Sequence, residues 1–405
     1  MSSITTSKLG AVLTFLSRGR VVLAVWVLLA VIATSKQILK GNYNNYLIFK
    51  NSFWHAWEQK NLYAAYPAEY FDLFYYGPIF PVLMAPFAVL PDFLGGLLWQ
   101  LANNLFLFYA ISRLPLKHSR TIAVLWLVAH EALTAMFNFQ INAGIAALVI
   151  MSLCLIREKK DFWAACLIML GTFIKLYGIV GVAFFFFSRQ KPTLVLSCIF
   201  WAMVFFGLPM LLFTPDFVLQ SYQDWYTALA AKNQLNSTSI MQDISVMGMA
   251  RRILQDPTLP NLPFLAAGLV LFFLPYLRIS QYRHAAFQMM LLASVLLFVV
   301  LFSSGSESPT YVIAFTGVAL WFMLQGRPIK PLYVGLMVFA FLLTSLSPSD
   351  LFPKVVREEF IKPFSLKALP CLLVWLAVTY DLLKTNFAQA SAVAPDQEPA
   401  TALPE

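Results

Sequence analysis

The chain has 405 residues, of which 60% are hydrophobic and only 12% are charged. A soluble domain carries about 25% charged residues, so this composition excludes an ordinary soluble enzyme and predicts an all-α, polytopic membrane bundle. The net charge of +9 comes mostly from lysines and arginines in short loops between apolar runs, which indicates membrane topology and not nucleic-acid binding. The cysteines lie inside apolar runs without paired spacing, so we expect them to pack and to form neither disulfides nor metal ligands: they are Cys154, Cys166, Cys198 and Cys371.

The segment after the first apolar run, 41–93, is predicted to be a large outer loop. Thirteen of the residues from 41 to 76 are aromatic, and such side chains collect at membrane–water interfaces. Four of them repeat at helical spacing: Tyr46, Phe49, Phe53 and Trp57. This pattern predicts an amphipathic helix that lies on the bilayer. Four prolines between positions 78 and 91 then predict a broken or re-entrant segment over 77–91.

Basic residues favour the cytoplasmic side of a membrane, and here they predict about twelve spans with both termini inside. The expected spans are 21–35, 94–112, 121–137, 141–156, two half-spans within 162–187, 193–213, 263–277, 285–302, 309–324, 332–345 and 367–383. They form a single membrane domain over 1–386, with outer loops at 41–93, 214–262 and 346–366. The Ala/Pro/Glu-rich segment 387–405 is predicted to be a disordered cytoplasmic tail.

The segment 162–187 is expected to enter and leave the membrane on the same side. It must therefore turn back within the bilayer, and the predicted turn is Lys175-Leu176-Tyr177-Gly178. A charged group at this depth costs about 2.5 to 3.5 kcal/mol. Lys175 therefore either binds an anion such as phosphate or pyrophosphate or extends its ammonium to the nearest interface.

The same topology places several polar clusters on the outer side. Gln140 and Asn142 stand in a short turn, where their amides either bind sugar hydroxyls or only form the turn. Glu307, in Ser-Ser-Gly-Ser-Glu-Ser-Pro, is either a catalytic or sugar-binding carboxylate or an acid that complements a helix dipole. Arg251 and Arg252 either bind a polyanionic ligand or form a solvated helix face.

The first loop contributes further candidates to the predicted site. Asn44 or Asn45 either caps the interfacial helix or contributes to the site. Asp72 is the acid nearest the apolar re-entry, where partial desolvation can raise its proton affinity. The predicted catalytic carboxylates are Asp72 and Glu307. The predicted substrate-binding residues are Asn44, Asn45, Tyr76, Gln140, Asn142, Lys175, Tyr177, Asp243, Arg251 and Arg252. No nucleotide-binding or zinc motif is found, so no cofactor and no metal are expected.

Several short motifs resemble glycosyltransferase family 87, whose members are polytopic enzymes of the GT-C superfamily that use lipid-phosphate sugars. The matching pieces are Asn45, Phe49 and Leu62-Tyr63 in the first loop, Tyr76-Gly77-Pro78-Ile79-Phe80, Ala85-Pro86 and Leu90-Pro91, Gln140-Ile141-Asn142, Lys175-Leu176-Tyr177-Gly178, and 245–252. The resemblance runs from about residue 41 to residue 320. It implies a GT-C-type bundle and a sugar, a mannose-like hexose or a pentose, moved from a polyprenyl-phosphate donor to a lipid or glycan acceptor. The implied setting is the outer face of a bacterial-type plasma (inner) membrane.

The chain departs from the family pattern at Asn45, where the resemblance implies an aspartate that acts as general base. An amide cannot accept the proton of an acceptor hydroxyl, and transfer with inversion needs a carboxylate there. Asp72 is the first candidate to replace it, and Glu307 is the second. The alternatives are a transporter or flippase of lipid-linked sugars and a non-catalytic sugar-lipid binder.

Overall fold

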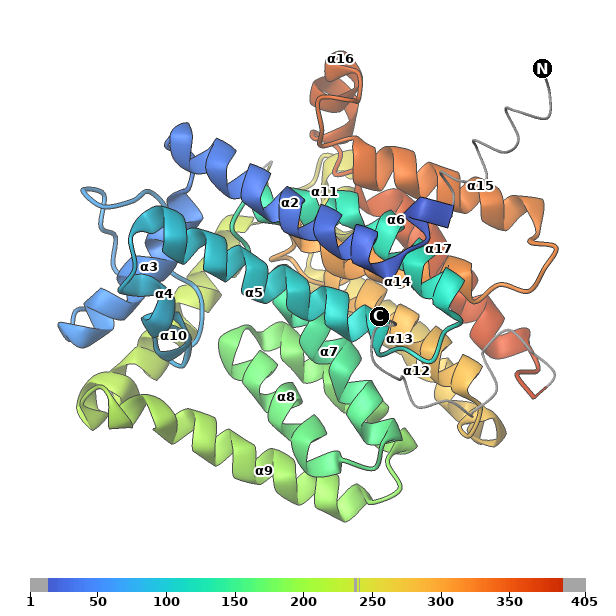
Figure 1. The fold of residues 1–405 in the computed structure, drawn as a ribbon, viewed down its shortest axis with the longest axis horizontal. Helices are drawn as coiled ribbons and strands as arrows, with labels where there is room; N and C mark the ends of the chain where they lie inside the picture. Colours follow the sequence, from blue (N-terminus) through green and yellow to red (C-terminus); the bar gives the residue numbers. More distant parts are fainter. Residues whose placement is uncertain (1–13, 237–238, 240, 389–405) are drawn as a thin grey trace.

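The computed structural model describes residues 14–236, 239 and 241–388, and this part of the chain is helical with no strand. The apolar helices are α2 (Gly19–Leu39), α5 (Asp92–Ser112), α6 (His118–Phe137), α7 (Asn142–Arg157), α8 (Asp161–Ile174), η1 (Leu176–Phe187), α9 (Lys191–Gly207), α12 (Asn261–Phe273), α13 (Ala285–Leu301), α14 (Tyr311–Met323), α15 (Pro331–Phe339) and α17 (Ala368–Lys384) (Figure 1). Every predicted span falls on one of them. The predicted tail lies outside the described residues from position 389 onwards.

Four helices are long and apolar enough to cross a membrane by length and composition: Gly19–Leu39, Asp92–Ser112, His118–Phe137 and Lys191–Leu211. Several shorter apolar helices accompany them. The all-helical prediction for a membrane protein is therefore confirmed for the described residues, while the number of about twelve spans stays a prediction.

The centre of the bundle is formed by α13 and α14, in which nearly every residue is buried. Helices that are apolar on all sides belong in such a position. By contrast, α9 leaves Leu196 and Met203 about two-thirds exposed. Exposed apolar side chains of this kind are suited to contact with lipid.

The predicted first outer loop, 41–93, folds onto the bundle through α3 (Asn44–Trp57) and α4 (Phe80–Ala88). The predicted interfacial helix exists, but its stripe packs against protein and does not face a bilayer. Phe49 is buried, and its ring centroid lies 4.9 Å from that of Phe80 and 5.8 Å from that of Trp99. The apolar face of α3 is therefore buried by packing against other parts of the protein. Only Trp57, at the end of the stripe, stays largely exposed.

The predicted re-entrant segment 77–91 contains α4, a helix of nine residues that begins with a proline in its first turn. Proline is tolerated there because the first N–H groups of a helix have no intrahelical partner.

The prediction of an asparagine cap for α3 is wrong, since Tyr43 is the cap residue and no side chain caps the helix.

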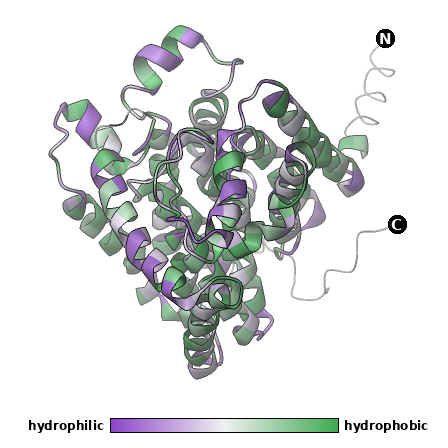
Figure 2. Cartoon of the chain, turned by 90° about the vertical axis from the view of Figure 1, so that its left-hand side faces the viewer, coloured by the Kyte–Doolittle hydropathy of each residue, from purple (hydrophilic) through white to green (hydrophobic). Residues whose placement is uncertain are grey.

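The other two predicted outer loops also contain helices. The second loop contains α10 (Pro215–Asn236) and α11 (Val246–Leu254), and the third contains α16 (Lys354–Val356) and η7 (Arg357–Ile361). Helices α3, α4 and α10 lie together at the left-hand end of the molecule in Figure 1. Figure 2 looks at this end, where hydrophilic stretches alternate with the hydrophobic ones that dominate the bundle.

Candidate functional site

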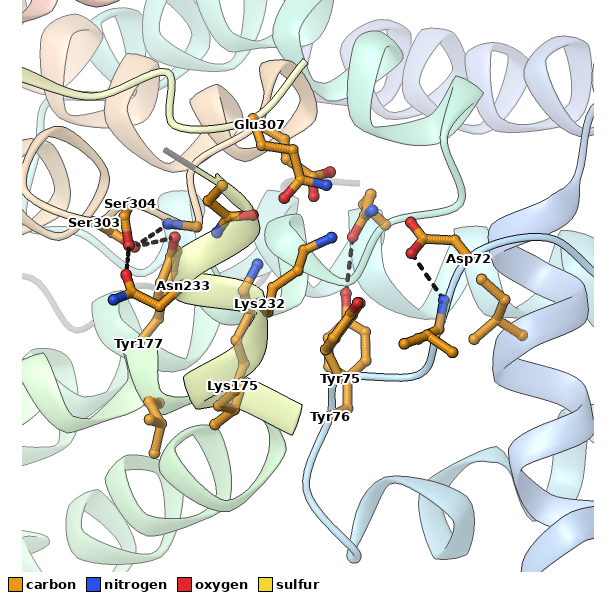
Figure 3. Close-up of a pocket in the computed structure, with 18 of the residues that line it drawn as sticks. Asp72, Tyr75, Tyr76, Lys175, Tyr177, Lys232, Asn233, Ser303, Ser304 and Glu307 are labelled. Carbon is orange, nitrogen blue, oxygen red and sulfur yellow. Dashed lines mark hydrogen bonds between the residues drawn. The ribbon is translucent and has the colours of Figure 1, made fainter. Parts of the chain in front are cut away.

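A cavity of ≈ 380 Å³ lies where the first loop, the α8–η1 turn, α10 and the loop after α13 meet. Its lining is mixed, with amides, hydroxyls, aromatic rings, two carboxylates and two lysines among the described residues (Figure 3). The lining residues are Asn45, Ile48, Phe49, Asp72, Leu73, Tyr75, Tyr76, Gln140, Lys175, Leu176, Tyr177, Trp225, Leu229, Lys232, Asn233, Asn236, Gln242, Ser303, Ser304, Gly305 and Glu307. Segments separated by more than 200 residues therefore share one cavity.

Lys175 reaches the cavity because α8 and η1 form a tight hairpin. A Cβ atom on Gly178 would lie 2.2 Å from the carbonyl carbon of Gly171, so the close approach of the two segments requires glycine at this position. At the other end of the hairpin, the Ser188 hydroxyl donates to Asp161. The predicted turn at Lys175 is thus present, with Lys175 in extended backbone between the two helices.

The ammonium of Lys175 is oriented by two neighbours. Its Nζ donates to Asn142 Oδ1 at 3.0 Å and lies 4.5 Å from the centroid of the Tyr177 ring. Neither contact supplies a negative charge. Among the described residues no carboxylate forms an ion pair with Lys175, so this ammonium in an apolar hairpin can accept an anionic ligand.

A second lysine enters the cavity from α10. Lys232 Nζ lies 4.4 Å from the centroid of the Tyr75 ring, and the indole N–H of Trp225 donates to the Tyr75 carbonyl at 2.9 Å. These contacts attach α10 to the part of the first loop between α3 and α4. The cavity therefore receives one lysine from each of two separate elements, as Figure 3 shows.

Glu307 lies in the loop between α13 and α14, at the cap position of η5 (Ser308–Thr310). Burial raises the pKa of its carboxyl, although the charges of Lys175 and Lys232 act in the opposite direction. Ser303, on the same loop, shares a hydrogen bond of 2.7 Å with the hydroxyl of Tyr177 from η1. Glu307 is thus a partly buried carboxylate that faces two cations.

Asp72 stands at the exposed edge of the cavity and is attached to the start of α3. Asn44 donates from Nδ2 to the Phe71 carbonyl at 2.7 Å and accepts the Phe71 N–H at 2.9 Å. Asp72 itself has a φ of 75° and accepts the Leu73 N–H at 2.8 Å. Asn45 follows Asn44, lines the cavity and donates from Nδ2 to the Asn138 carbonyl at 2.9 Å. The hydrogen bonds of Asn44 thus hold Asp72 in the same cavity as Asn45.

Residues 74–304, more than half of the chain, match the model of glycosyltransferase family 87. The chain belongs to this family. No curated protein matches it. The resemblance inferred from the short motifs is confirmed, and the protein is a membrane glycosyltransferase with a donor and an acceptor substrate.

The family 87 match does not extend over the whole cavity. It covers Tyr76, Gln140, Lys175 and Lys232, and it leaves out Asn45, Asp72 and Glu307. The match therefore assigns no role to either carboxylate. Within residues 14–236, 239 and 241–388, no group of three or more histidine, cysteine or acidic side chains is arranged to hold a metal ion.

The structure brings seven of the predicted site residues of this glycosyltransferase into the cavity: Asn45, Asp72, Tyr76, Gln140, Lys175, Tyr177 and Glu307. The Tyr76 hydroxyl donates to Gln140 Oε1 at 2.9 Å. Asn44 and Asn142 lie behind the lining and hold Phe71 and Lys175.

Asp243, Arg251 and Arg252 are not among the described lining residues. Arg251 Nη1 lies 2.5 Å from Asp243 Oδ2, and both side chains are buried. Arg252 donates to the carbonyls of Ser239 and Gln242. The first two charges therefore neutralise each other inside the protein, and all three residues support the segment that carries Gln242 to the cavity.

The α10 side of the cavity was missed by sequence reasoning. Its lining residues recur at helical spacing and so form one face of the helix: Trp225, Leu229, Lys232, Asn233 and Asn236. This periodic stripe was the available signal.

Proposed function

We propose that this family 87 enzyme moves a mannose-like hexose or a pentose from a polyprenyl-phosphate donor to a lipid or glycan acceptor. The observation that carries the proposal is the entry of Lys175 and Lys232 into one cavity from separate elements. Two ammonium groups suit the phosphate of a lipid carrier. The amides and hydroxyls around them suit a sugar, because each can donate or accept a hydrogen bond.

The two carboxylates are assigned different tasks. Asp72 stands at the exposed edge, where an acceptor hydroxyl enters, and serves as general base. Glu307 faces the lysines and accepts hydrogen bonds from hydroxyls of the donor sugar. The leaving phosphate then stays with the lysines while Asp72 takes the acceptor proton from the other side, as a displacement with inversion requires.

The test is to incubate the purified protein in lipid nanodiscs with polyprenyl-phosphate-linked mannose, glucose and arabinose and an extract of membrane lipids. Formation of free polyprenyl phosphate, followed by mass spectrometry, reports transfer whatever the acceptor is. We expect one donor to be consumed only when the extract is present. Binding of a donor without consumption would favour the non-catalytic binder, and sugar-lipid movement across proteoliposomes without transfer would favour the flippase.

We further propose a GT-C-type arrangement in a bacterial-type inner membrane, with both termini cytoplasmic and the cavity facing outward. In a variant without its native cysteines, Leu351→Cys lies on the third outer loop and Lys159→Cys lies between α7 and α8; both positions are exposed. A membrane-impermeant maleimide should label position 351 in intact cells and position 159 only after permeabilisation. The reverse pattern would place the cavity on the cytoplasmic side.

A further inference from the structure

A buried ion pair lies behind the cavity. Glu131, in the last third of α6, has no exposed surface, and Lys367, which precedes α17, is also buried. Lys367 Nζ lies 3.1 Å from Glu131 Oε1 and 3.2 Å from Oε2. Removing two charges from water is costly, and their mutual attraction repays that cost only in good geometry with further hydrogen bonds. Such a pair in a membrane bundle calls for a reason beyond packing.

The further hydrogen bonds lead to the cavity loop. The same ammonium donates to the carbonyl and to the hydroxyl of Ser308, each at 3.0 Å, and it lies 5.1 Å from the centroid of the Tyr311 ring. Ser308 directly follows Glu307. The Lys367 ammonium thus links Glu131 of α6 to Ser308, the residue next to the cavity carboxylate.

The other side of Glu307 is fixed as well. The Ile244 N–H donates to the Ser306 carbonyl at 2.9 Å, and the Ser306 hydroxyl donates to the Val300 carbonyl at 2.6 Å. Of the two residues beside Glu307, Ser308 is the one that a charged side chain holds within the described part of the chain. Glu307 also forms a capping box with Thr310, in which its N–H donates to Thr310 Oγ1 at 3.2 Å. Loss of Lys367 would therefore free Ser308, and with it the capping-box turn that carries Glu307, while Ser306 stays attached.

We propose that Glu131 and Lys367 are positioning residues that hold the Glu307 carboxylate in the cavity. The inference rests on the proposed function, in which Glu307 contacts the donor sugar. Neither member of the pair lines the cavity within the described residues, so both act through Ser308. The ion pair is what makes the position of Ser308 rigid. The Lys367 ammonium can bind Ser308 firmly in this buried place because Glu131 neutralises its charge.

Replacing only Glu131 or only Lys367 would leave an unpaired buried charge and destabilise the fold. The test therefore replaces both residues together. Glu131→Leu with Lys367→Met replaces the ion pair by apolar side chains, and Glu131→Gln with Lys367→Gln keeps two amides that can pair. Lys367→Arg retains both the charge and the donors. Asp381→Asn is the control, since Asp381 is a buried acid near the other end of α17 that accepts from Tyr333 at 2.6 Å.

The deciding measurement does not need turnover. Glu307 is modified with a water-soluble carbodiimide, and its rate of modification is followed by peptide mass spectrometry, beside thermal unfolding and kcat/KM. In whichever double variant folds, we expect faster modification of Glu307 and a loss of about 10²-fold in kcat/KM, the usual cost of a misplaced group. Lys367→Arg and Asp381→Asn should keep the wild-type modification rate.

A folded double variant with the wild-type rate of Glu307 modification would overturn the proposal and leave a purely structural ion pair. If the wild-type protein consumes no donor, the proposed function fails on its own, while faster modification of Glu307 in the double variants still supports the positioning role.

Discussion

Asp72→Asn should lower kcat for sugar transfer by about 10²- to 10⁴-fold, the usual contribution of a general base, while donor binding stays unchanged. The substitution is nearly isosteric and removes only the capacity to accept a proton. The Leu73 N–H can still donate to the remaining oxygen, and asparagine tolerates the positive φ of this position. Initial-rate kinetics and binding of the donor to detergent-solubilised protein separate the two effects.

Glu58→Gln is the matched control for this prediction. Glu58 is another acid of the first loop, and it is half exposed and paired with Lys60 outside the cavity, so its replacement should leave kcat intact. Full activity of Asp72→Asn would move the role of base to Glu307, which Glu307→Gln tests in parallel. If neither carboxylate matters and Asn45→Asp creates activity, the native chain is a non-catalytic sugar-lipid binder.

The helices of this protein could be predicted because bilayer-length apolar runs and basic loops leave few alternatives. The turn at Lys175 followed from the same reasoning, since a charge and a glycine in an apolar run mark a place where the chain must bend. The meeting of Tyr76, Gln140, Lys175 and Glu307 in one cavity could be expected from topology alone, because all four residues were assigned to the same side.

Other features depend on contacts that a single sequence does not encode visibly. An aromatic stripe such as that of α3 is equally suited to lipid and to protein, and only the presence of Phe80 and Trp99 decides between them. The pairing of Arg251 with Asp243 is likewise a property of the folded chain. Lys232 was missed because its helix carries polar residues on every side, which hides the face that meets the cavity.

Lys175→Met should weaken binding of polyprenyl phosphate by about 10- to 100-fold, which corresponds to the loss of one charge-assisted hydrogen bond. Methionine keeps the length and apolar stem of the side chain, so the α8–η1 hairpin should stay folded. Lys232→Met should have a similar effect, because the second ammonium enters the same cavity from α10. Binding is measured on full-length protein in nanodiscs, with thermal unfolding as a check on the fold.

Lys60→Met is the control, since Lys60 is exposed and pairs only with Glu58 among the described acids. The two cavity lysines differ in one respect that sharpens the test. Lys175 is also held by Asn142 at 3.0 Å, so Asn142→Leu should weaken phosphate binding through disorder of the Lys175 side chain and should have no further effect in the Lys175→Met background. Unchanged binding in Lys175→Met would mean that this lysine only extends its ammonium towards water, and the phosphate would then have to rest on Lys232 alone.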